Sequence, residues 1–127
     1  MDQIVLHVDK MNDLTIVEVH GALTKENIIQ TIGEFYGKQP TPSLLWDFSK
    51  ATTIDLNLED LQSIAENIKG LMMHRTHGRT AFVKSKVVNS GLGELFKAYA
   101  GFSNLPYEYK IFCNQQDALD WLNEIVY

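Results

Sequence analysis

Residues 44–61 read LLWDFSKATTIDLNLEDL and contain the transition that decides the fold. The apolar run Ser43–Ser49 follows a proline turn and is typical of a buried strand. A polar stretch, Ser49–Asn57, leads from this run to Asn57, which can cap a helix with Asp60 three residues later. Apolar residues then recur at helical spacing over about four turns. The stretch therefore predicts a buried strand, a loop and an amphipathic helix.

Two strands and a helix are expected before this stretch. Ile4–Val8 alternates apolar and polar residues, and Leu14–His20 is rich in β-branched residues. A short polar turn separates them, which predicts an antiparallel hairpin. Gly21 closes the second strand, and Thr24 then caps a helix over Lys25–Tyr36.

The chain after the central helix alternates strands and helices again. Arg79–Lys84 and Tyr107–Cys113 have strand patterns. An amphipathic segment that opens after Ser90 and ends at Gly101 lies between them. Asn114 caps a last helix that presents Ala118, Leu119 and Leu122 on one face.

The expected order is β-β-α-β-α-β-α-β-α in a single domain over residues 1–127. Strands that alternate with helices are joined by right-handed crossovers, which makes the later strands parallel. We therefore expect an α/β fold with a mixed sheet of about five strands, an antiparallel N-terminal hairpin and about four helices. Ligands of such sheets usually bind beyond the carboxyl ends of the parallel strands.

Composition excludes disordered, collagen-like and disulfide-scaffold proteins. The 127 residues are 45% hydrophobic, enough for a core without disulfides or metal. The single cysteine, Cys113, points to a reducing cytoplasm. The N-terminus lacks the basic and apolar regions of a signal peptide, and no apolar run approaches the ~20 residues of a membrane span. We expect a soluble bacterial cytoplasmic protein that is not an integral membrane protein.

The distribution of charge argues against nucleic-acid binding. The formal net charge is −5, although five basic residues and no acidic residue lie between Asn67 and Gly93. Three of the five fall at the amino end of the Arg79–Lys84 strand, and only Lys84 and Lys86 fall at its carboxyl end. A broad polyanion-binding surface is therefore not expected.

Two predicted loops, Ser49–Asn57 and Ser85–Gly91, leave the carboxyl ends of neighbouring strands. If the strands are parallel, these loops bring together the candidate ligand- or partner-binding residues Ser49, Thr52, Thr53, Asp55, Asn57, Lys84, Lys86 and Ser90. Backbone N–H groups at two helix starts, beside two lysines, suit an anion. The alternative is structural: Asn57 and Ser90 are ordinary helix caps and the lysines are solvated.

The other groups of polar residues in the sequence predict no catalytic, metal or cofactor site. The spacing His74-x-x-His77 lacks the further ligands of a metal shell. The nucleophile candidates Ser49, Ser90 and Cys113 have no histidine and acid paired with them in the sequence. His7 and His20 sit on strands, where histidines with satisfied hydrogen bonds are expected.

The segment LLWDFSKATTIDLNLEDL resembles the STAS domain of bacterial anti-sigma-factor antagonists. Asp47, Ile54 and Asp55 match the family pattern, while Asn57 stands where that family has its phosphorylatable serine. A closer likeness is to the divergent SpoIIAA-like group, related in fold to Sec14-type (CRAL-TRIO) lipid-binding domains. The features shared with this group include the first hairpin and the ending YKIFC followed by DALDWL. The resemblance implies the fold and a non-enzymatic role.

Three functions remain open from the sequence. The leading hypothesis is a STAS-like regulatory module that acts through protein–protein contacts, with a protein partner or a homodimer. The second is a carrier of a lipid or a small anionic ligand, with the head group near Lys84, Lys86 and Ser90 and the tail under the Leu92–Phe102 helix. The third is an unrecognised hydrolase.

Overall fold

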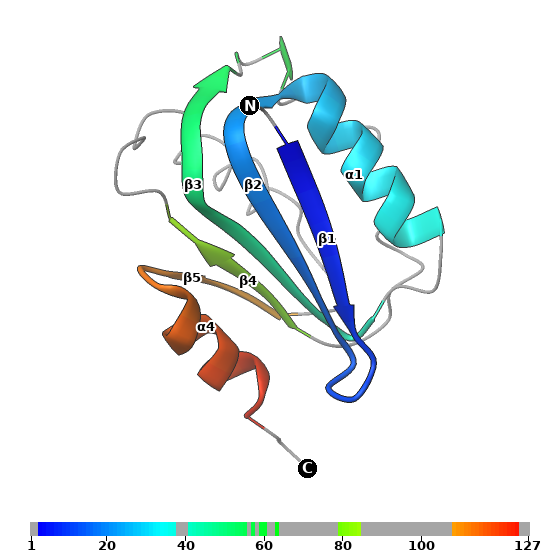
Figure 1. The fold of residues 1–127 in the computed structure, drawn as a ribbon, viewed down its shortest axis with the longest axis vertical. Helices are drawn as coiled ribbons and strands as arrows, with labels where there is room; N and C mark the ends of the chain where they lie inside the picture. The colour runs from blue at the N-terminus through cyan, green and yellow to red at the C-terminus, as the bar shows by residue number, and fades with distance from the viewer. Residues whose placement is uncertain are drawn as a thin grey trace.

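A computed structural model describes residues 3–37, 41–55, 57, 59, 60, 63, 79–84 and 108–124. Its elements are five strands and two helices (Figure 1). In chain order they are β1 (Gln3–Asp9), β2 (Leu14–Thr24), α1 (Lys25–Gly37), β3 (Ser43–Asp55), β4 (Arg79–Val83), β5 (Glu108–Phe112) and α4 (Gln115–Leu122). The predicted helix after Asn57 lies largely, and the one after Ser90 wholly, outside the described residues.

The five strands form one mixed sheet in the order β1-β2-β3-β4-β5. Strand β1 is antiparallel to β2, and every later neighbour is parallel. The predicted hairpin and parallel sheet are therefore confirmed. No helix within the described part of the chain combines the length and apolar character that a membrane span requires.

The two helices cover opposite faces of the sheet. On β3, Leu44, Trp46 and Phe48 join the core that includes Ile28, Ile32 and Phe35 of α1. Leu45 instead packs in a second core with Ala118 and Leu122 of α4. Because successive strand residues point to opposite faces, the two cores lie on either side of the sheet.

Helix capping follows the sequence prediction at both described helices. The N–H of Asn27 donates to Thr24 Oγ1 at 3.3 Å, and the N–H of Thr24 donates to Asn27 Oδ1 at 2.9 Å. The N–H of Asp117 donates to Asn114 Oδ1 at 2.9 Å. Each cap satisfies backbone donors that the first turn leaves without a helical partner.

Strands β2 and β3 both run further than the sequence predicted. The sequence predicts that Gly21 closes β2 and that residues 49–57 form a loop, yet β2 continues to Thr24 and β3 to Asp55. The two extensions pair with each other, from Gly21 opposite Ala51 to Thr24 opposite Asp55. Gly21 has φ 82°, a conformation that glycine adopts at little cost, so it bends β2 without ending it.

Two bulges interrupt the pairing of β2 with β3. Glu18 opposes Asp47, but His20 opposes Lys50, so β3 holds one extra residue between these pairs. A second extra residue follows Ala51. Phe48 and Ala51 are three residues apart, and the first bulge lets both face the α1 core.

Candidate functional site

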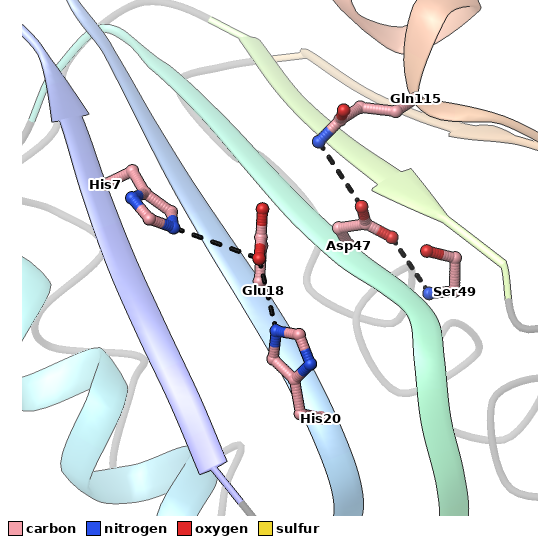
Figure 2. A network of polar contacts seen from close by, with 6 residues as sticks. All are labelled: His7, Glu18, His20, Asp47, Ser49 and Gln115. Carbon is pink, nitrogen blue, oxygen red and sulfur yellow. Dashed lines mark hydrogen bonds and ion pairs between the residues drawn. The ribbon is translucent and has the colours of Figure 1, made fainter.

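The buried carboxylate of Asp47 connects β3 to α4. Asp47 lies on the α4 face of the sheet with 7% of its surface exposed. Its Oδ1 accepts a hydrogen bond from the N–H of Ser49 at 2.9 Å, and its Oδ2 accepts one from Gln115 Nε2 at 3.3 Å (Figure 2). Gln115 is the first residue of α4. One side chain therefore links the strand bulge to the start of the C-terminal helix.

The bulge explains why a hydrogen-bond acceptor is needed at this position. An extra residue in one strand disturbs the ladder of backbone hydrogen bonds. Ser49 lies at this irregularity, and its N–H donates to Asp47. A buried donor or acceptor without a partner costs about 1–3 kcal/mol, so Asp47 and Ser49 stabilise each other.

A second polar group lies next to Asp47 on the same face. Glu18 is the register partner of Asp47 across β2 and β3. Its Oε2 lies 3.1 Å from His20 Nε2 and 3.9 Å from His7 Nε2. Figure 2 shows both imidazoles directed toward this carboxylate from β1 and β2. The interpretation of a strand histidine with a hydrogen-bonding partner fits His20, whereas His7 Nε2, at 3.9 Å, is beyond hydrogen-bond distance of Glu18.

Sequence reasoning did not select Asp47, Glu18 or Gln115 as site residues. The signal for the two acids was present, because each interrupts an apolar strand, in LLWDF and in TIVEV. Buried acids in such runs are kept only where partners accompany them. The role of Gln115 had no local signal, because it is 68 residues from Asp47 in the sequence.

Two of the predicted site residues lie within one residue of the same level of the sheet. Asp47 pairs with Val83, where β4 ends, so Ser49 within β3 lies one residue beyond the level of Lys84. Both side chains are exposed. The backbone N–H of Lys84 donates to the carbonyl of Phe112 at 3.0 Å, which fixes where β4 ends beside β5.

The remaining described candidates lie further along β3. Thr52, which is exposed, Thr53 and Asp55 belong to the strand extension beside β2 and not to a loop. Asp55 opposes Thr24, five β2 positions beyond Val19, which lies at the level of Phe48 and Lys84, and at about 3.3 Å per residue this is roughly 17 Å of strand. The register therefore separates the acidic end of β3 from Lys84.

Asn57 is exposed and makes a reciprocal pair of hydrogen bonds with Asp60. The N–H of Asn57 donates to Asp60 Oδ2 at 3.1 Å, and the N–H of Asp60 donates to Asn57 Oδ1 at 2.8 Å. This is the predicted capping arrangement. Lys86 and Ser90, together with the loop Ser85–Gly91 and the helix expected to cover a lipid tail, lie outside the described residues.

The described part of the chain holds no group of three histidine, cysteine or acidic side chains arranged to bind a metal ion. Its histidines contact Glu18, and the exposed thiol of Cys113 is free. The described polar side chains on this face therefore form hydrogen bonds within the protein. Exposed hydroxyl, amide and ammonium groups lie along the second half of β3, just after it and at the end of β4.

The structural comparisons identify the class of fold. The chain is similar to an uncharacterized DUF3478-family protein with a SpoIIAA-like fold from Shewanella loihica PV-4, at 20% identity and a TM-score of 0.59, over 96% of this chain and 95% of the other. An anti-sigma factor antagonist from Mycobacterium paratuberculosis is 16% identical with a TM-score of 0.61, over 98% and 96% of the two chains.

The anti-sigma factor antagonist SpoIIAA in its unphosphorylated form is also similar, at 16% identity and a TM-score of 0.58, over 97% of this chain and all of the other. The sequence matches no protein-family model and no curated protein. The resemblance drawn from the residues is therefore confirmed at the level of the fold: the chain has a STAS/SpoIIAA-like fold.

Proposed function

We propose that the protein is a STAS-like regulatory module that binds a protein partner through the exposed end of β3 and the residues that follow it. The fold is shared with two anti-sigma factor antagonists over nearly the whole chain. Ser49, Thr52 and Asn57 are exposed along this segment. Exposed polar groups on a rigid strand and helix start suit recognition of another protein's surface better than enclosure of a small molecule.

The observation that carries this proposal is the exposed amide of Asn57, which stands where the family that the chain resembles has its phosphorylatable serine. A related solved structure shows SpoIIAA in a phosphorylated form. In this chain the corresponding residue, Asn57, carries an amide. Its Oδ1 accepts a hydrogen bond from the N–H of Asp60. An amide cannot be phosphorylated, so we infer that binding here is not switched by a phosphate at residue 57.

Affinity purification from the native host, with quantitative mass spectrometry, tests this proposal. Thr52→Arg and Asn57→Lys place bulky cations on the proposed surface, and we expect both to remove the same protein from the recovered set. Lys10→Glu, in the exposed β1–β2 turn, is the control and should keep it. If all variants recover the same proteins as the wild type, this surface does not bind the partner.

A further inference from the structure

No described strand pairs with the outer edge of β1. Figure 1 shows β1 at the margin of the sheet, and β2 is the only described strand that pairs with it. Its seven residues pair with β2 in unbroken register from Gln3 to Asp9. Alternate backbone N–H and C=O groups along these residues point away from β2. An edge of this length is a template for another strand.

The sequence of β1 carries none of the usual protections against pairing. The strand QIVLHVD contains no proline and no lysine, and its one acidic residue, Asp9, is the last. Its pairing with β2 shows no bulge. Val8 is 59% exposed although it is a large apolar residue on an edge. Natural edges that stay unpaired normally carry at least one of these devices.

We propose that two copies of this chain pair through β1, antiparallel and centred on Leu6, into one continuous sheet. Some residues of β1 point their backbone N–H and C=O groups away from β2. The two copies can form backbone hydrogen bonds only in registers that place such residues opposite each other. Of these, the register centred on Leu6 pairs all seven residues, whereas centres at Val5 or His7 pair fewer. This inference is independent of the proposed function, because β1 is a separate strand from β3.

The side chains are self-complementary in this register. Exposed Val8 meets Ile4 of the second copy, and Leu6 meets its own equivalent, all on the face that α1 covers. Ile4 and Leu6 are only partly buried against the α1 core in one copy, so pairing removes further apolar surface from water. Asp9 meets the neutral Gln3 of the second copy, so no like charges confront each other.

Sedimentation velocity of the full chain, from micromolar to sub-millimolar concentration, tests the dimer. The wild type should shift reversibly from monomer to dimer. Val8→Lys, which puts a charge beside Ile4 of the second copy, should raise the dissociation constant by at least about tenfold. Met11→Lys is the matched control, because Met11 is 95% exposed in the turn outside the paired residues, and it should dimerise as the wild type does.

A disulfide tests the register. In a Cys113→Ser background, Leu6→Cys would place two thiols on the two-fold axis with Cα atoms about 4.5–5.5 Å apart, within disulfide range. Mild oxidation should give a covalent dimer, and Met11→Cys should not form one at a comparable rate. A wild type that remains monomeric at every concentration, or a Val8→Lys variant that dimerises as tightly as the wild type, overturns the proposal.

Discussion

Glu18 and Asp47 oppose each other on the parallel strands β2 and β3, so two carboxylates occupy adjoining positions on one face of the sheet. Like charges in this relationship destabilise a sheet unless other groups compensate. Each acid has its own partners: His20 and His7 for Glu18, and the N–H of Ser49 and the amide of Gln115 for Asp47. Removing one acid or the other should therefore change the free energy of unfolding by different amounts.

Asp47→Ala should lower the free energy of unfolding by about 1–3 kcal/mol, because it leaves a backbone donor at the bulge and the Gln115 amide without their acceptor. Asp47→Asn, which keeps an acceptor oxygen, should cost less. Urea denaturation measures both. Asp120→Ala is the control, since Asp120 is exposed and accepts from Gln116 in the same helix. Equal losses for Asp47→Ala and Asp120→Ala would contradict this role.

The turn after β1 should contribute to stability in a pH-dependent way. The Asn12 side chain, at 2.8 Å, holds the pKa of Asp9 below its ordinary value against the opposing effect of desolvation, and the backbone N–H groups of Asn12 and Met11 add to the lowering. A lowered pKa in the folded state means that the contribution is present above the unfolded-state pKa and is lost as pH falls through the folded value.

NMR titration of the Asp9 carboxyl group measures this effect. Asn12→Ala should raise the pKa of Asp9 toward its ordinary value, because it removes the largest of the stabilising hydrogen bonds. Asn123→Ala, in an exposed position after α4, should leave it unchanged. An Asp9 pKa that does not move in Asn12→Ala would show that the backbone donors alone hold the carboxylate.

Asn57→Ala should destabilise the protein by about 1 kcal/mol, because it removes the acceptor for the N–H of Asp60. Asn57→Asp and Asn57→Ser retain an acceptor and should recover most of the loss. Thermal unfolding compares the three variants. A neutral Asn57→Ala would mean that this cap adds nothing to the fold and that its side chain is free to serve binding alone.

Arg79 should hold the end of α4 on the sheet. Its Nη1 donates to the carbonyl of Trp121 at 2.7 Å, and its guanidinium carbon lies 4.8 Å from the centre of the Trp121 ring. Arg79→Lys cannot keep both contacts and should cost about 1–2 kcal/mol, with faster amide exchange in α4. Lys110→Ala, at an exposed strand position, should change unfolding by less than about 0.5 kcal/mol. Unchanged exchange in α4 would contradict the assignment.

The order of the described elements could be predicted because local signals mark each one. Thr24 and Asn114 cap helices as expected, and the β-branched run of Leu14–His20 forms a strand. The extensions of β2 and β3 could not be predicted. Gly21 has the local character of a strand end, and only the pairing of the two extensions with each other makes both segments extended.

The spacing of the candidate site residues along the sheet could not be predicted from the sequence. Ser49 and Lys84 lie close in level on paired strands, but Asp55 and Asn57 lie further along because β3 does not end at Ser49. The length of a strand depends on partners far away in sequence, whereas caps and turns depend on neighbours. Contacts such as Asp47 with Gln115 are therefore the ones that sequence patterns miss.

The bulge between Asp47 and Lys50 makes β3 sensitive to length. Upstream of the extra residue, even-numbered positions such as Trp46 and Phe48 face α1, and downstream of it the odd-numbered Ala51 does. One residue inserted or deleted in the regular ladder before the bulge would turn the side chains on one side of the change to the other face of the sheet. We therefore expect substitutions to be tolerated in this segment far more readily than insertions or deletions.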